Sequence, residues 1–267
     1  MIFTDSHCHL DFPELFQQLP QLLTKCSDKN IKRIVIPSVD PNNWQNVLDL
    51  SQQHQSTHCQ LLACLGIHPW FLDSLSALDL SNLTKLATEQ QTELAAIGET
   101  GIDLTIAEQS LEPEKHLAKQ IDFFEYQLHL ANQLNLPVII HHRKSHQHIV
   151  PILKKMKVKK AGIIHAFSGS FEQAKNYLDL GFKLGIGGTI TYPRALKTIK
   201  TVTKLPLQSL VLETDAPAMP LNNFQGQVNT PLRILDVFQA LIALRSEPKR
   251  EIAAQLEKNV AQVFNCK

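Results

Sequence analysis

The length, composition and charge of the chain limit the classes of protein to which it can belong. Its 267 residues, 43% of them hydrophobic, can bury a large core, and roughly 250 residues is the usual size of a single α/β barrel. With 26 basic and 25 acidic residues the formal charge is +1, which excludes a general field that gathers nucleic acid or an anionic membrane, so any polyanion must be bound locally.

Cysteine usage and hydropathy indicate the compartment. The five cysteines are odd in number and form no C-x-x-C pair, which argues against a disulfide framework or a zinc finger and is typical of a reducing cytosol. The N-terminus has no basic segment followed by an apolar run, and no apolar stretch approaches the roughly 18 residues that span a membrane. We therefore expect a soluble, cytoplasmic protein with no membrane association and no obligate protein partner.

Short apolar runs rich in Val and Ile alternate along the chain with longer stretches of helical periodicity. Strands are predicted, in chain order, at 2–9, 31–38, 61–68, 94–102, 136–142, 161–167, 182–190 and 209–215. Helices are predicted near 42–54, 78–91, 110–134, 146–157, 170–180, 194–203, 230–245 and 248–264. Eight strands interleaved with helices predict a closed TIM (β/α)₈ barrel that forms a single domain over residues 1–267, with an open doubly wound sheet as the alternative.

Residues that can bind a metal stand at the C-terminal ends of six predicted strands. They are His9, His68, Glu99, His141, His165 and Asp215. In a barrel these ends meet at one face, where the active site is built. A single histidine after a β-branched run is more often a hydrogen-bonded core residue, but the agreement of six strand ends predicts a shared metal site.

The segment TDSHCHLDFP near the N-terminus places two histidines and a cysteine in a row. Side chains alternate along a strand, so His7 and His9 point one way and Cys8 the other. If both histidines face the barrel axis, Cys8 faces the helices and is not a ligand. Asp11 either supports one histidine or only begins the next loop.

The candidate ligands are too many for one metal. Four histidines and two carboxylates exceed the four ligands of a tetrahedral zinc and suit two divalent cations that share a carboxylate. We assign His7, His9, Glu99 and Asp215 to one metal, and Glu99, His141 and His165 to the other. Such ligation accepts Zn, Mn, Co or Ni, and Mg less readily.

Paired metals of this kind predict hydrolysis of a phosphate ester. Metals about 3.5–4 Å apart lower the pKa of a shared water and hold the attacking and leaving oxygens of the ester. The expected nucleophile is a metal-bound hydroxide, with Asp215 accepting the proton as general base.

Seven sequence blocks in order resemble the TatD family of metal-dependent hydrolases, and the last blocks resemble its YjjV-like branch. The blocks are TDSHCHLD, GIHPW, IGETGID, LPVIIHHR, IIHAFSGS, GGTITYP and VLETDAP. The resemblance implies an amidohydrolase-like TIM barrel, a pair of divalent metals and a deoxyribonuclease activity. The family's ligand positions fall on His7, His9, Glu99, His141, His165 and Asp215 of this chain, the same residues as above.

The chain departs from the family pattern in two places. Where many members have His-Ser-Arg, this chain has His141-His142-Arg143, and His142 points away from the axis if His141 points inward. The loop NNFQGQVNTP after the last strand carries no Lys or Arg, although phosphate contacts provide most non-specific DNA affinity. We therefore assign His142 no metal role, and the lack of basic residues in the loop weakens the expectation of a long DNA footprint.

Three further residues are candidates for contact with a substrate, each with a structural alternative. His68 can contact a phosphate, or only shape a turn with the proline after it. Arg143 can hold a phosphate through two hydrogen bonds, or pair with a nearby carboxylate. Asp103 can contact substrate, or orient Arg143 or a ligand histidine.

Two other features are weighed in the same way. Glu213 shares a strand face with Asp215 and is either a supporting carboxylate for the site or a surface ion pair. The lysine run from Lys154 to Lys160 ends a predicted helix, which places it at the end of the barrel opposite the site and favours a structural role.

Three functions remain open from the sequence. The leading one is a two-metal phosphodiesterase that acts on a phosphate ester or DNA. The second is amide or ester hydrolysis of a small molecule on the same barrel, where many enzymes bridge their metals with a carbamylated lysine in place of Glu99. The third is a non-catalytic metal-binding protein.

Overall fold

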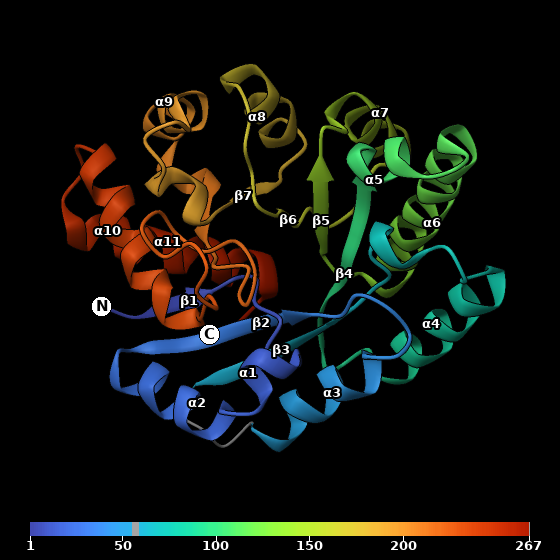
Figure 1. Cartoon of the computed structure of the whole chain (residues 1–267), viewed down its shortest axis with the longest axis horizontal. Coiled ribbons are helices and arrows are strands. Elements are labelled where there is room, and N and C mark those ends of the chain that lie inside the picture. The colour runs from blue at the N-terminus through green and yellow to red at the C-terminus, as the bar shows by residue number, and fades with distance from the viewer. Residues whose placement is uncertain (55–58, 267) are drawn as a thin grey trace.

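The sheet confirms the predicted barrel. A computed structural model describes residues 1–54 and 59–266, in which eight parallel strands follow one another in chain order. The ring closes between the first and last strands, because Ser6 N donates to Leu212 O and Asp215 N donates to His7 O, both at 2.9 Å. Figure 1 looks along the barrel and shows the helices arranged around the strands. The chain is a single-domain TIM barrel.

The strands are mostly shorter than the apolar runs that predict them. The strands are β1 (Phe3–Asp5), β2 (Ile31–Pro37), β3 (Gln60–Leu65), β4 (Leu94–Asp103), β5 (Val138–Arg143), β6 (Ile163–Ile164), β7 (Lys183–Ile186) and β8 (Leu210–Leu212). The helices are α1 (Pro13–Phe16), α2 (Leu19–Asp28), α3 (Trp44–Gln53), α4 (Ala77–Glu89), α5 (Leu104–Gln109), α6 (Pro113–Leu134), α7 (His146–Met156), α8 (Phe171–Leu178), α9 (Leu196–Lys204), α10 (Ile234–Leu244) and α11 (Lys249–Phe264). Short 3₁₀ helices are η1 (Pro69–Phe71), η2 (Gly188–Thr191), η3 (Leu207–Ser209) and η4 (Pro231–Arg233). No helix in the described part of the chain is both long enough and apolar enough to span a membrane.

The sequence analysis left the connection between the first two strands without a helix, and this was wrong. The structure places α1 and α2 there, with Leu19, Leu22, Leu23 and Cys26 of α2 buried against the barrel. These apolar positions recur at helical spacing, but Pro20 interrupts the run near its start. Proline is tolerated in the first turn of a helix, where its missing N–H would have no partner, so it does not exclude α2.

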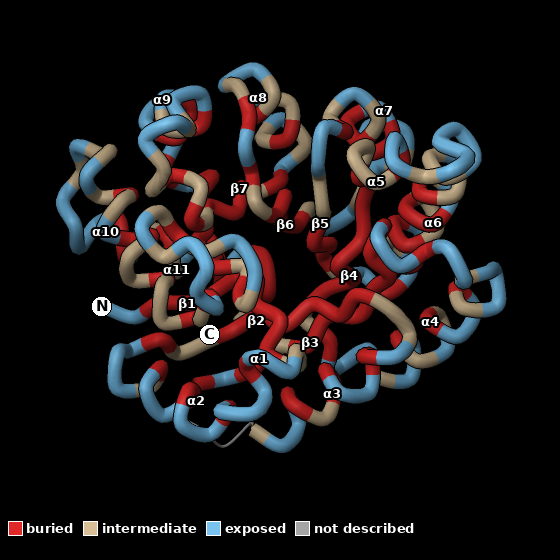
Figure 2. Tube along the Cα trace, in the orientation of Figure 1, coloured by how far each residue is buried: buried red, intermediate tan, exposed pale blue. Residues whose placement is uncertain are grey.

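The barrel interior below the strand ends is apolar and closed. One side chain each from β2 to β6 and from β8 meets the last turns of α11 in a small cluster. Its strand members are Val35, Cys64, Ala96, Ile139, Ile163 and Val211. Most strand residues are buried, as Figure 2 shows, so the interior is a packed core, and the candidate metal ligands gather at the open end.

An irregularity in β4 turns Glu99 toward the axis. Ala96 packs in the barrel interior, so strict alternation would turn Glu99 outward. The register with β5 shifts between Ile97 and Thr100, and this breaks the alternation. Gly101 then lies so close to the neighbouring strand that a Cβ there would be 2.0 Å from the carbonyl oxygen of His141, so only glycine fits.

Candidate metal centre

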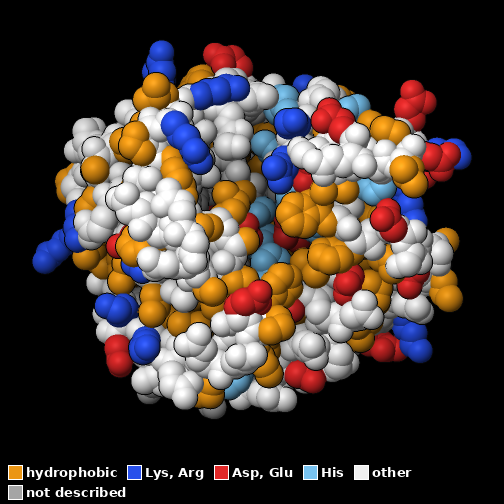
Figure 3. All heavy atoms as spheres, in the orientation of Figure 1, with side chains coloured by type: hydrophobic (Ala, Val, Ile, Leu, Met, Phe, Trp, Pro, Cys, Tyr) orange, Lys and Arg blue, Asp and Glu red, His pale blue; other side chains and the backbone are white. Residues whose placement is uncertain are grey.

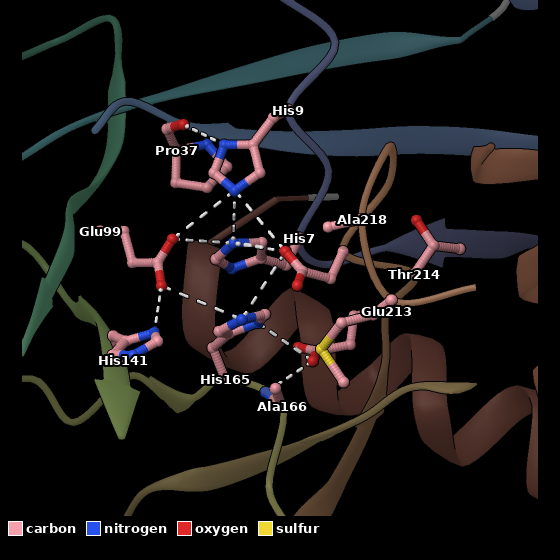
Figure 4. A network of polar contacts seen from close by, with 12 residues as sticks. His7, His9, Pro37, Glu99, His141, His165, Ala166, Glu213, Thr214 and Ala218 are labelled. Atoms are coloured by element: carbon pink, nitrogen blue, oxygen red, sulfur yellow. Dashed lines mark hydrogen bonds and ion pairs between the residues drawn. The ribbon is translucent and has the colours of Figure 1, made fainter. Parts of the chain in front are cut away.

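The six predicted ligands meet at the C-terminal ends of the strands. His7 and His9 follow β1, Glu99 lies within β4, His141 lies within β5, and His165 and Asp215 follow β6 and β8. Figure 4 shows His7, His9, Glu99, His141 and His165 pointing toward one another from the different strands. Figure 3 shows the same end of the barrel as a hollow with histidine and acidic side chains at its floor.

Four donor atoms form the first group. The Nε2 atoms of His7 and His9 lie 3.2 Å apart. Each lies 3.6 Å from Asp215 Oδ1, and Glu99 Oε2 lies 3.1 Å from His7 Nε2 and 3.6 Å from His9 Nε2. Ligands about 2.0–2.2 Å from a zinc-sized ion in tetrahedral geometry are separated by about 3.3–3.6 Å, so these donors have the spacing of a coordination shell.

The second oxygen of Glu99 faces a different set of histidines. Glu99 Oε1 lies 3.0 Å from His141 Nδ1, 3.3 Å from His68 Nε2 and 3.9 Å from His165 Nε2. His165 Nε2 also lies 3.7 Å from Asp215 Oδ1. The two oxygens of one carboxylate are therefore divided between two groups of nitrogen donors, as in a bridging ligand.

The outer nitrogens of His9 and His141 are hydrogen-bonded to an acceptor, and that of His165 lies beside a carboxylate, so the inner nitrogen of each ring faces the centre. His9 Nδ1 lies 3.1 Å from Pro37 O, His141 Nε2 lies 3.2 Å from Asp103 Oδ2, and His165 Nδ1 lies 3.1 Å from Glu213 Oε1. In the neutral form of each ring, an N–H facing the acceptor leaves the other ring nitrogen unprotonated. This is how proteins orient histidines that bind metals, so the donor set fits a divalent cation.

His68 differs from these histidines in its tautomer. Its Nδ1 accepts a hydrogen bond from Trp70 N at 3.1 Å, so the proton of the neutral ring is on Nε2. Burial and the nearby His141 lower the pKa of His68 to about 4, although Glu99 opposes them. His68 therefore presents an N–H, not a lone pair, to Glu99 and to anything bound beside it.

Glu213 is buried behind His165. Its Oε1 accepts a hydrogen bond from Ala166 N at 2.6 Å, and its side chain is 1% exposed. A Cβ on Gly185 would lie 2.0 Å from Glu213 Oε2, so a glycine in β7 makes the room for this carboxylate. Glu213 is thus part of the site's support rather than a surface ion pair.

A buried carboxylate also joins the ends of β1 and β8. Asp5 accepts hydrogen bonds from His7 N at 3.3 Å and from Thr214 N at 2.9 Å, and its other oxygen accepts from Thr214 Oγ1 at 2.5 Å. Burial raises the pKa of Asp5 to about 8, against the effect of these bonds. The sequence analysis assigned Asp5 no role, because only the closed barrel brings it next to Thr214.

Burial and neighbouring charge act in opposite directions on the titrating groups. Burial raises the pKa of Glu99, but the imidazoles around it, with His68 first, hold that pKa well below its usual range. The pKa of Asp215 is likewise lowered, because His165 and other imidazoles outweigh burial. Burial lowers the pKa of His165, yet Glu213 and other carboxylates raise it to about 10. Without a bound cation, protonated imidazole balances the ionised carboxylates of the centre, and a divalent cation would displace that proton on binding.

The remaining predicted residues lie around the centre in different settings. Asp103 is fully buried, and its Oδ2 accepts from Trp70 Nε1 at 2.6 Å and faces His141. Arg143 is exposed at the end of β5 and forms no ion pair with any described residue. Trp70, in the sequence block GIHPW, has a place at the site that sequence reasoning missed.

Cys8 and His142 both lie outside the donor groups. Cys8 is fully buried in the main core, and its backbone forms a parallel bridge with Ala216. His142 stacks on Tyr177 with ring centroids 5.5 Å apart, on the outer side of β5. The groups of described residues that could hold a metal include neither of them. Asp11 accepts a hydrogen bond from Asn43 Nδ2 at 2.8 Å.

Comparison with known proteins gives this arrangement a family. The profile of the family described as TatD related DNase matches residues 4–265. The chain is 40% identical to the metal-dependent hydrolase YjjV of Escherichia coli (strain K12), over 98% of both chains. It is also 40% identical to a metal-dependent hydrolase of Haemophilus influenzae, over 99% of this chain and 100% of the other.

Solved structures agree with these matches. The crystal structure of YjjV from Escherichia coli superposes with a TM-score of 0.93 at 40% identity, and covers 99% of this chain and 98% of that one. The fold and the cluster of donors thus define a metal-dependent hydrolase built on a TIM barrel. The chain belongs to the TatD family, and it is similar to YjjV along its whole length.

Proposed function

We propose that the protein is a phosphodiesterase of the deoxyribonuclease type that uses two divalent cations. The observation that carries the proposal is the divided carboxylate of Glu99, whose Oε2 lies 3.1 Å from His7 Nε2 and whose Oε1 lies 3.0 Å from His141 Nδ1. A bridging carboxylate between two groups of ligands is typical of paired-metal sites that cleave phosphate esters.

The residues that would hold the cations follow from the two donor groups. His7, His9, Glu99 and Asp215 would hold one, and Glu99, His141 and His165 the other. Mixed imidazole and carboxylate donors suit Zn, Mn, Co or Ni better than Mg. When bound, such cations would supply the Lewis acidity that neutralises phosphate oxygens and makes a water more acidic.

Asp215 is placed to accept a proton from the attacking water. Its side chain is 15% exposed, whereas that of Glu99 is 3% exposed, so Asp215 is the carboxylate of the pair that water can reach. Its pKa is lowered by His165 and other imidazoles despite burial, so it is ionised and able to act as a base. A residue in this role bonds the water on one side and returns the proton to the leaving group or to solvent.

Three other side chains act on the substrate or on a ligand. The Nε2–H of His68 and the guanidinium of Arg143 would donate to phosphate oxygens, since His68 lies beside Glu99 and Arg143 is exposed at the C-terminal end of β5. Asp103 is fully buried and bonded to Trp70, so we assign it to the orientation of His141 rather than to contact with substrate.

Replacing Asp215 tests the mechanism. Asp215→Asn keeps the side chain's shape but removes the base, and we expect kcat for a phosphodiester to fall about 100-fold or more. The rate is measured on DNA and on bis(p-nitrophenyl) phosphate, with metal content determined for both proteins. Substantial activity in Asp215→Asn with its full metal content would remove Asp215 as the base.

The substrate class is tested by a direct screen. The purified protein is analysed for bound metal and then assayed on DNA, on nucleotides and on small amides. Metal-dependent release of phosphomonoester or nucleotide products is the expected result. Turnover of amides alone would overturn the phosphodiesterase proposal and favour the small-molecule amidohydrolase.

A further inference from the structure

A large aromatic side chain stands half exposed at the edge of the metal centre. Trp70 lies in η1, which follows β3, and is 48% exposed. Its ring centroid is 5.3 Å from that of His68 and 6.2 Å from that of His141. The exposed indole is therefore next to two residues of the proposed active site.

One hydrogen bond orients the indole of Trp70, and a second holds its backbone. Its Nε1 donates to Asp103 Oδ2 at 2.6 Å, and the backbone N of Trp70 donates to His68 Nδ1 at 3.1 Å. The polar edge of the ring is thus satisfied within the protein, and the exposed part is apolar ring surface. A rigid aromatic with a free face loses little conformational entropy when a flat group stacks on it.

The surroundings of Trp70 combine aromatic surface with positive charge. Phe71 is 38% exposed and extends the apolar surface beside His68. Arg143 is the strand partner of Asp103, the residue that holds the indole, and it forms no ion pair with any described residue. Figure 3 shows hydrophobic side chains on both sides of the hollow and Lys or Arg side chains along one border. A ligand that joins a flat apolar ring to an anionic group would match this surface.

We propose that Trp70 stacks on a nucleobase of the substrate, next to the phosphate that is cleaved, while Arg143 faces that phosphate. The inference rests on the proposed phosphodiesterase function and names its substrate class: a nucleotide ester whose base is free of a duplex stack. Stacking needs only the flat face of a base, so the subsite accepts any of the four bases.

Kinetics on two matched substrates test the stacking. The substrates are a thymidine dinucleotide and the same dinucleotide with both bases removed (tetrahydrofuran sugars). In Trp70→Ala the ratio of kcat/KM for the base-bearing substrate to that for the abasic one falls about 5- to 150-fold, the range for loss of one base–aromatic stack. The ratio cancels any effect on the shared chemistry that follows from losing the bond to Asp103.

Two further variants separate the ring face from other effects. Trp70→Phe keeps an aromatic face but lacks the N–H, so it keeps most of the ratio. Phe16→Ala removes another exposed aromatic, 53% exposed on α1, and leaves the ratio unchanged. A ratio near one in the wild type, or an equal loss in Trp70→Phe and Trp70→Ala, overturns the stacking proposal while the phosphodiesterase proposal stands.

A binding measurement tests the same contact without turnover of a phosphodiester. The chain has two tryptophans, and in Trp44→Phe the emission reports Trp70 alone. Thymidine 5′-monophosphate, added to the metal-loaded variant, quenches this emission to saturation, whereas 2-deoxyribose 5-phosphate does not. Absence of quenching by both overturns the subsite, and hydrolysis of no phosphodiester at all overturns the proposed function instead.

Discussion

At the scale of single residues, the segment TDSHCHLDFP contains side chains of the metal centre and a side chain of the core. His7 and His9 bring their Nε2 atoms within 3.2 Å of each other, while Cys8 is buried in the main core. Burial, followed by nearby carboxylates, raises the pKa of the Cys8 thiol well above its usual value, so it is not poised to be a thiolate ligand. The alternation of side chains along an extended chain was enough to predict this from the sequence.

Replacement of neighbouring residues in this segment should have unequal effects on metal content. Cys8→Ser keeps a side chain of similar size in the core, so we expect the protein to retain its metal. His9→Ala removes one donor of the first group, and metal affinity should fall by about 100-fold or more. Metal analysis after dialysis measures both. An equal loss in the two variants would restore Cys8 as a third ligand.

At the scale of elements, the sequence predicted the eight strands in order and the donors near their C-terminal ends, but not how those ends are joined. His141 and His165 were found because each closes a β-branched run, and the register of β5 and β6 brings them together. Glu99 was predicted as a ligand from its place at a strand end and from the family pattern, but alternation along β4 alone would not turn it inward, because that turn depends on the register shift. The α2 helix was missed because Pro20 interrupts its regular apolar spacing. The Asp5–Thr214 contact was missed because it joins residues 209 positions apart in the chain.

The Asp5–Thr214 contact predicts a coupled loss of stability and metal binding. Asp5→Ala leaves Thr214 N, Thr214 Oγ1 and His7 N without their acceptor in a buried setting, so we expect a destabilisation of roughly 2–4 kcal/mol. Metal affinity should fall about 10- to 100-fold, since His7 and Asp215 flank these bonds. Urea unfolding of the metal-free protein and metal titration measure the two effects.

Thr214→Val is the matched control for Asp5→Ala. It removes only the hydroxyl bond to Asp5 and keeps the backbone bond, so it should lose less stability than Asp5→Ala. Unchanged metal affinity in Asp5→Ala would show that the ends of β1 and β8 are held together without it.

At the scale of the whole molecule, basic side chains lie at both ends of the barrel but in different surroundings. The lysine run from Lys154 to Lys160 begins in the last turn of α7, at the end of the barrel opposite the metal centre. Lys155 pairs there with Glu125 at 2.9 Å, and Lys160 lies beside the last turns of α11. Arg143 stands at the open end of the barrel and has no partner among the described residues. A nearly neutral molecule would bind a polyanion through few basic side chains. Their position relative to the site decides which of them contribute to binding.

Removal of basic side chains at the two ends of the barrel should have different effects on oligonucleotide binding. Arg143→Ala should weaken binding of a short single-stranded oligonucleotide about tenfold, since a charge-assisted contact to phosphate is lost. The slope of log K against log salt should decrease by about 0.7, the value for one phosphate contact on a single strand. The triple replacement of Lys157, Lys159 and Lys160 by Gln should change the affinity less than about twofold, because these residues lie beyond the reach of a strand in the site.

Fluorescence anisotropy at several salt concentrations, in an Asp215→Asn background that prevents cleavage, compares the two proteins. A larger loss in the lysine variant than in Arg143→Ala would place the nucleic-acid surface at the closed end of the barrel, and the phosphate role of Arg143 would fall with it.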